Sequence, residues 1–135
     1  MPDVLVDSNV ILDVLVEKSA WREWSANALE YAAERARLVI NPIIYAELSV
    51  GYERIELVEF ALPPIFKRDP IPYEAAFLAG KVYLEYRRRG GFRSAPLPDF
   101  FIGAHAAVKG YDLLTRDMTR YRTYFPTVRL IAPEG

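Results

Sequence analysis

The chain has 135 residues, a formal net charge of −1 and no cysteine. This length suits one domain with its own core, so we expect a single domain over residues 1–135 that folds without a disulfide. The nearly balanced charge excludes binding of a polyanion by overall attraction, which leaves that task to a local basic patch or a bound cation. The sequence shows neither a signal peptide nor an apolar run of about 20 residues, which predicts a cytoplasmic protein without membrane contact.

Short apolar runs alternate with helical patterns along the chain. We expect strands over residues 4–6, 38–40, 113–114 and 128–131, with a minor edge strand at 65–66. We expect helices over approximately 9–16, 20–35, 42–52, 55–61, 73–89, 98–109 and 118–124. Strands separated by helices predict parallel pairing with helices on both faces of the sheet, so the sequence indicates an α/β fold. In such folds ligands bind beyond the carboxyl ends of the strands.

The expected helix ends carry local signals. Ser8 or Asn9 is expected to cap the first helix and Ser19 the second, because their side-chain oxygens can accept the free N–H groups of a first turn. Pro42 suits the first turn of the third helix. Glycines at 90–91 and at 110 are expected to end two of the others.

Four carboxylates lie at the rims of core segments, where a charge has no evident structural reason to be: Asp7, Glu47, Asp99 and Asp117. Two of them follow apolar strands, and the other two lie on core-facing stripes of helices. Carboxylates about 4 Å apart repel by roughly 4 kcal/mol at an effective dielectric near 20, and a divalent cation removes that conflict. With no cysteine and one histidine, oxygen ligands remain, which favours Mg²⁺ or Mn²⁺.

Each acid also has an ordinary interpretation. Aspartate is a preferred helix cap, so Asp7, Asp99 and Asp117, taken singly, fit caps more readily than ligands. Glu47 could pair with an arginine. Two further acids, Asp69 and Asp112, are interpreted as turn residues.

The basic residues gather in two places, at 87–89 with Arg93, and at Arg116 with Arg120 and Arg122. The first group ends a helix, where the dipole favours cations whatever their function, yet it could also hold a polyanionic backbone.

His105 follows Asp99 by six residues and is therefore turned about 240° away from it on a helix, which favours a packing or surface role.

Four segments, taken in order, resemble the four motifs of PIN-domain ribonucleases: VLVDSNVIL at 4–12, NPIIYAEL at 41–48, PDFFIGAHA at 98–106 and LLTRD at 113–117. Their order and spacing are similar to those of the VapC toxins of bacterial and archaeal toxin–antitoxin pairs, over nearly the whole chain. Each motif alone is weak, whereas four in this order are specific. The departures are Gly103 and His105, which stand where the family often carries alanine and a small hydroxyl residue.

The resemblance implies a PIN-like three-layer α/β/α fold with a small parallel sheet of four to five strands, and a Mg²⁺- or Mn²⁺-dependent endoribonuclease. It implies that the four acids bind the metal and are catalytic. Ser8, Asn9 and Thr115 would bond to the acids, the metal's water or the scissile phosphate. It further implies two partners, a second copy of the chain and an antitoxin whose C-terminal segment covers the site. The residues expected to hold RNA are Arg87, Arg88, Arg89, Arg93 and Arg116.

Other functions stay open. A DNA-directed or RNA-maturation nuclease could use the same acids, since metal-assisted hydrolysis treats both backbones alike. A metal-free binding module of the same fold is disfavoured because all the acids remain. A receiver or phosphatase-like domain would usually show a second acid beside Asp7 and a lysine at a late strand end, where this chain has Thr115 and Arg116.

Overall fold

The computed structural model describes residues 2–16, 18–91 and 97–133. The strands in these ranges are β1 (Val4–Val6), β2 (Leu38–Ile40), β3 (Phe66–Arg68), β4 (Asp112–Leu114) and β5 (Leu130–Ile131). The helices in these ranges are α1 (Ser8–Leu15), α2 (Arg22–Arg35), α3 (Pro42–Ser49), α4 (Ile55–Ala61), α5 (Tyr73–Arg88), α6 (Leu97–Lys109) and α7 (Thr119–Tyr124).

The strands described here form one parallel sheet in the order β3-β2-β1-β4-β5. The chain starts at the centre, moves outward to β3, and then returns to the other side of β1, where Leu5 pairs with Leu113. The carboxyl ends of β1 and β4 are therefore neighbours at the point where the strand order reverses, the usual ligand position in open α/β sheets. The predicted α/β fold and the parallel sheet, which has five strands within the described ranges, are confirmed.

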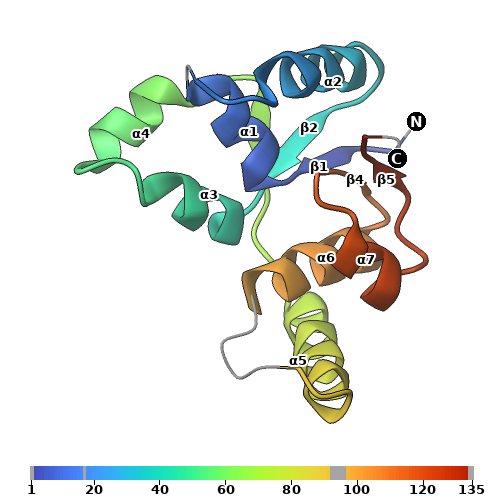
Figure 1. Cartoon of the computed structure of the whole chain (residues 1–135). Helices are drawn as coiled ribbons and strands as arrows, with labels where there is room; N and C mark the ends of the chain where they lie inside the picture. Colours follow the sequence, from blue (N-terminus) through green and yellow to red (C-terminus); the bar gives the residue numbers. More distant parts are fainter. Residues whose placement is uncertain (1, 17, 92–96, 134–135) are drawn as a thin grey trace.

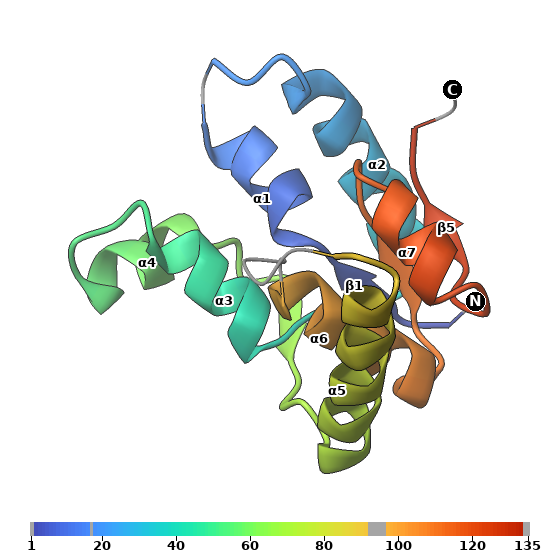
Figure 2. The same ribbon diagram turned by 60° about the horizontal axis from the view of Figure 1, so that its bottom comes forward.

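Helices cover both faces of the sheet. Figure 1 shows α1 and α2 above the strands and α5 and α6 below them. Helix α5 packs on α6, and α3 touches both α1 and α6. Figure 2 shows that α3 and α4 together extend away from the sheet. No helix in the described ranges is long and apolar enough to cross a membrane.

The core explains why the central strands are readable from sequence. The side chains of β1 are fully buried, and Leu113 and Leu114 of β4 are equally inaccessible. A parallel strand covered by helices on both faces needs apolar residues at every position, not at alternate ones. Below the sheet, the Phe100 ring contacts Tyr83, Tyr86 and Tyr124 at centroid distances of 5.4 to 6.1 Å, which fixes α6 against α5 and α7.

The predicted N-caps are partly wrong. Helix α1 begins at Ser8 with Asp7 in the cap position, so neither Ser8 nor Asn9 caps it. Helix α2 begins at Arg22, and the Ser19 hydroxyl donates instead to Asp13 at 2.8 Å. Asn41 is the side chain that caps, since its Oδ1 accepts the Ile44 N–H at 2.9 Å, with Pro42 in the first turn as predicted.

Several boundaries also differ from expectation. The edge strand β3 covers 66–68 and not 65–66, α3 ends at Ser49 and not near Tyr52, and β5 begins at Leu130 and not at 128. Asp112 is not a turn residue, because it is the buried first residue of β4. The glycine stops are confirmed: Gly90 and Gly110 have φ values of 91° and 70°, the left-handed conformation that ends a helix at little cost for glycine.

Candidate functional site

The four acids lie around the carboxyl ends of the two central strands. Asp7 directly follows β1, and its N–H donates to the Leu114 carbonyl at 2.9 Å, which ties it to the end of β4. Asp117 lies in the segment after β4, Glu47 in α3 and Asp99 in the first turn of α6. The site is thus assembled from four separate stretches of the chain.

The aspartates do not act as helix caps. Asp7 occupies the cap position of α1 but makes no side-chain cap bond. Asp99 lies inside α6, and α7 has Met118, not Asp117, in its cap position. The structural interpretation of these residues as caps is therefore wrong, and their carboxylates are available to the site.

The Asp7 carboxylate is held by one of its two oxygens. Its Oδ2 accepts from Thr115 Oγ1 at 2.9 Å, from Tyr121 OH at 3.0 Å and, more weakly, from Asn9 Nδ2 at 3.5 Å. Its Oδ1 accepts no hydrogen bond from the described residues. The group is only 4% exposed, so its orientation is fixed and one oxygen remains as a free acceptor.

Burial and mutual repulsion act on the pKa values of the acids. Burial raises the pKa of Asp7 to about 6, the charges of Asp99 and Glu47 add to the rise, and the bonds from Thr115 and Tyr121 oppose it. Burial also raises the pKa of Glu47 and of Asp99, and Asp117 contributes to the rise at Asp99. The four carboxylates are therefore close enough to affect one another electrostatically.

Two of the other acids also have protein partners. Ser8 Oγ donates to Glu47 Oε1 at 2.9 Å, which links α1 to α3. Arg120 Nη1 donates to Asp99 Oδ2 at 2.8 Å. With these rotamers, no group of three or more acidic or histidine side chains in the described ranges is arranged to hold a metal ion. The four-acid metal site stays a prediction.

Tyr121 is a residue of the site that sequence reasoning missed. Its buried hydroxyl donates to Asp7 and lies 3.4 Å from Asp99 Oδ1, so it stands between the two acids. Burial, followed by the charges of Asp7 and Asp99, raises its pKa well above 10.0, which keeps it a donor. The sequence feature that could have identified Tyr121 is its position four residues after Asp117, in a short helix that follows the last motif.

Asn9 and Thr115 lie beside Asp7 and connect two segments of the chain. Asn9 Nδ2 is 3.4 Å from Thr115 Oγ1, and Asn9 Oδ1 accepts the Arg116 N–H at 3.4 Å. Thr115 Oγ1 also accepts the Asp117 N–H at 3.1 Å. These bonds connect the start of α1 with the segment after β4, so they fix the position of Asp117 relative to Asp7.

Arg116 has a structural partner. Its Nε and Nη2 donate to the two oxygens of Asp13 at 2.7 and 3.1 Å, and its guanidinium lies 5.7 Å from the Trp21 ring. Burial opposes ionisation of Asp13, but the Arg116 bond, with those from Ser25 and Ser19, brings its pKa below the usual value. Arg116 therefore holds α1 and α2 to the segment that carries Asp117.

The other arginines lie near the carboxyl end of α5. Arg89 donates to Glu85 at 2.7 Å and its guanidinium lies over the Tyr124 ring at 5.5 Å. Arg87 and Arg88 are exposed in the last turn, and Arg93 lies outside the described residues. A role of this group in RNA binding stays a prediction.

His105 has the packing role expected for it. It is fully buried, and its Nδ1 lies 3.0 Å from Asn41 Nδ2. Because the Asn41 oxygen accepts from Ile44, the amide nitrogen must donate, so Nδ1 is unprotonated and the proton sits on Nε2, 3.5 Å from Asp69. Burial lowers the pKa of His105, which keeps this neutral form.

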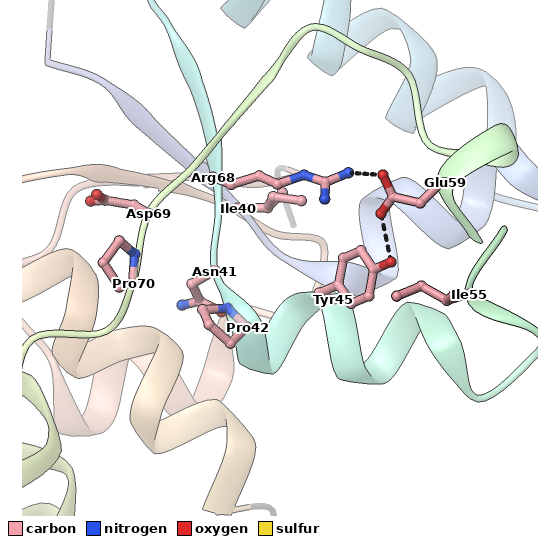
Figure 3. A pocket seen from close by; sticks show the side chains of 9 residues that line it. All are labelled: Ile40, Asn41, Pro42, Tyr45, Ile55, Glu59, Arg68, Asp69 and Pro70. Atoms are coloured by element: carbon pink, nitrogen blue, oxygen red, sulfur yellow. Dashed lines mark hydrogen bonds and ion pairs between the residues drawn. The ribbon is translucent and has the colours of Figure 1, made fainter.

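The described residues form hollows that a ligand could enter. One of about 490 Å³ lies beside α3 and α4; there Tyr45 OH and Arg68 both donate to Glu59, and none of the four acids lines it (Figure 3). A second, of about 420 Å³, borders Asp117 directly. Its lining comes from α5, α7 and the segment between β4 and α7: Tyr86, Asp117, Thr119, Arg120, Thr123 and Tyr124.

Solved structures with the same fold share little sequence with this chain. A structure described as VapBC2 from Rickettsia felis bound to a DNA fragment from their promoter is 18% identical, covers 97% of this chain and 98% of its own, and has a TM-score of 0.75. A toxin–antitoxin complex from Klebsiella pneumoniae is 24% identical, with 98% coverage of both chains and a TM-score of 0.71. FitAcB from Neisseria gonorrhoeae is 19% identical, with 95% and 96% coverage and a TM-score of 0.69.

No match was found among curated protein sequences. The model of one protein family, described as the PIN domain, matches residues 4–126 and so spans all four motifs and every acid of the site. This chain belongs to the PIN-domain family.

Proposed function

We propose that this chain is a divalent-metal-dependent endoribonuclease and the toxin of a type II toxin–antitoxin pair. The observation that carries the proposal is the held orientation of Asp7 at the strand ends of a PIN domain: its Oδ2 is bonded, while Oδ1 accepts no hydrogen bond from the described residues. A buried carboxylate with a raised pKa, surrounded by other acids, favours binding of a cation.

The donor set fits a hard divalent ion in its chemistry, because all four side chains offer oxygens. Asp7, Glu47, Asp99 and Asp117 would hold Mg²⁺ or Mn²⁺, and cation entry would compete with the Arg120–Asp99 ion pair. The bound ion would supply a water of lowered pKa and a counter-charge for the phosphate.

The chain's own residues have positioning tasks in this scheme. Thr115, Tyr121 and Asn9 fix the Asp7 carboxylate, and Ser8 fixes Glu47. A fixed first ligand lowers the reorganisation needed when substrate binds, which is a general source of catalytic efficiency. The raised pKa of Asp7 means that the cation must displace a proton below about pH 6, so we expect activity to fall on acidification.

The decisive experiment is a cleavage assay on single-stranded RNA and DNA with Mg²⁺, with Mn²⁺ and with EDTA. Asp7→Asn and Asp99→Asn should abolish cleavage while the fold is kept. Glu30→Gln is the matched control, since Glu30 is an exposed acid of α2 that lies outside the acid cluster.

Product chemistry supplies an independent check. Attack by water on the phosphate with cleavage of the bond from phosphorus to the 3′-oxygen leaves a 5′-phosphate and a 3′-hydroxyl and does not use the 2′-hydroxyl. A 2′,3′-cyclic phosphate, or full activity of Asp7→Asn, contradicts the proposal. Cleavage of DNA in preference to RNA would favour the DNA-directed alternative.

The proposed partners are a second copy of the chain and an antitoxin, acting in the cytoplasm. The similar structures include complexes described as VapBC and as a toxin–antitoxin complex. Helices α4 and α5 expose large apolar side chains, with Phe60 93%, Tyr73 90% and Phe77 68% accessible, as surfaces that bind proteins do. Light scattering tests the dimer, and co-purification with the product of an adjacent short gene tests the antitoxin.

A further inference from the structure

We propose that the hollow beside Asp117, between α5 and α7, binds the nucleotide of the RNA strand next to the cleaved phosphate, with Arg120 bonded to a phosphate oxygen. This inference rests on the proposed function and specifies where its substrate lies. The hollow shares Asp117 with the acid cluster. A strand whose scissile phosphate lies at the acids can therefore place its next nucleotide against this lining.

Arg120 has donors left for a phosphate. Its Nη1 bonds to Asp99, and no other hydrogen bond of its guanidinium is present among the described residues. A guanidinium carries several N–H donors in a planar fork, so Arg120 can bind an anion both while Nη1 is bonded to Asp99 and after a cation has displaced that bond. Its side chain is about one quarter exposed and lines the hollow, where a phosphate can reach it.

The aromatic side of the hollow suits a nucleoside. The Tyr86 and Tyr124 rings meet edge to face with centroids 5.8 Å apart, and Phe100 packs against both. The rings are therefore held in place by the core before any ligand binds. Rigid aromatic surfaces beside a basic groove are a common way to bind single-stranded nucleic acid with little dependence on sequence.

The remaining lining is polar. Thr119 and Thr123 are exposed on α7, and Thr123 Oγ1 donates to the Thr119 carbonyl, so its oxygen can still accept from a ribose hydroxyl or a base. Among the described residues that line the hollow none is aliphatic. The hollow therefore offers hydroxyl groups, two aromatic rings and a guanidinium, which together match the ribose, the base and the phosphate of a nucleotide.

The test measures RNA binding without cleavage, by fluorescence anisotropy of a short labelled single-stranded RNA in EDTA. Thr123→Glu introduces a negative charge at the exposed wall of the hollow, and Thr123→Gln is its neutral match. We expect the glutamate to weaken binding by about tenfold through repulsion of the phosphate, and the glutamine to change it by less than about twofold.

A second pair of variants tests Arg120. Arg122 lies on the same helix but lines a different hollow, with Phe125, Pro126, Val128 and Leu130. Arg120→Ala should reduce the slope of log affinity against log salt by about 0.7, the amount for one phosphate contact on a single strand, while Arg122→Ala leaves it unchanged. Because Arg120→Ala removes the partner of Asp99, unfolding curves for all four variants accompany the binding data.

The outcomes separate this inference from the proposed function. If Thr123→Glu binds RNA like Thr123→Gln, and both arginine variants give the same salt slope, the hollow is not the nucleotide site. Cleavage by the wild-type protein with Mg²⁺ would then still support the nuclease. If the wild-type protein neither binds nor cleaves RNA, the proposed function fails and this inference fails with it. A Thr123→Glu variant that loses antitoxin binding but keeps RNA affinity assigns the hollow to the protein partner and overturns the proposal.

Discussion

Replacing Asp7 with asparagine should stabilise the metal-free protein while it abolishes activity. Burial raises the pKa of Asp7 from 3.8 to about 6. At pH 7 the folded protein therefore contains an ionised carboxylate at a position where the neutral acid is more stable. One pKa unit is worth about 1.4 kcal/mol, which makes the cost about 3 kcal/mol. Asparagine keeps an oxygen for Thr115 and Tyr121 to donate to and removes the charge that Asp99 and Glu47 repel.

The difference in unfolding free energy between Asp7→Asn and the wild type should depend on pH. Below pH 3.8 Asp7 is protonated in both the folded and the unfolded state, so the variant and the wild type should have similar stability. As pH rises toward 6, the unfolded chain loses its proton first, and the wild type should lose stability relative to Asp7→Asn. Above about pH 6 the difference should stay constant at its maximum.

Urea unfolding in EDTA, from pH 3.5 to 8, measures the difference directly. Asp13→Asn is the control with the opposite sign, because hydrogen bonds to Arg116 hold the pKa of Asp13 below its usual value and their loss should destabilise the protein. A wild type that is as stable as Asp7→Asn at pH 7, or a difference that grows on acidification, would refute the electrostatic account of the site.

Further predictions concern neighbours of the acids. Tyr121→Phe removes a hydrogen bond to Asp7, so calorimetry should show Mn²⁺ affinity about tenfold weaker, as for other residues that orient metal ligands, and an unchanged affinity would exclude this role. Gly103→Ala places a methyl group in the Phe125 ring, and its unfolding free energy should fall by about 1–3 kcal/mol; a wild-type urea midpoint would contradict that packing. His105 is neutral and accepts from Asn41, and burial lowers its pKa, so its contribution to stability should be lost as pH falls below 6.5. A His105→Gln variant should show a flatter acid limb in the same unfolding series, and an identical limb would show that this group does not titrate on unfolding.

The central part of the fold could be predicted from sequence because its signals are local. β1 and the Leu113–Leu114 part of β4 are buried on both faces, so these residues form uninterrupted apolar runs. The edge strand β3 exposes Lys67 and Arg68, and a strand with one apolar residue carries no such run. Its register is set by pairing with β2, which is a tertiary contact that the pattern does not contain.

The capping errors have a common physical cause. Ser8 and Ser19 have the side chains of good caps, but their hydroxyls donate to the carboxylates of Glu47 and Asp13, which lie outside the helices that they were expected to cap. A charge-assisted hydrogen bond to a carboxylate is stronger than a neutral one accepted from a backbone N–H, so the carboxylate partner prevails over the local preference. The same argument applies to Arg116, whose guanidinium is taken by Asp13.

The positions of Asp7 and Asp117 after strands could be predicted from sequence, but the hydrogen-bond partners of the acids could not. Tyr121 resembles any aromatic core residue in sequence, and only the fold shows that its hydroxyl meets Asp7. Arg120 and Arg122 look equivalent two residues apart, yet the turn of α7 sends one to Asp99 and the other to a different hollow. Donor and acceptor pairs between distant segments are the part of a site that a single sequence does not encode visibly.

These partners explain how one chain can keep four acids together before a cation binds. Asp99 is neutralised by Arg120, Glu47 is bonded by Ser8, and Asp7 is bonded through one oxygen by Thr115 and Tyr121. Each contact lowers the cost of a buried negative charge without occupying every oxygen. Because the donors come from α1, α7 and the segment after β4, the same contacts that hold the acids also hold these segments together. Any cation that binds the acids should therefore stabilise the whole fold as well as the site.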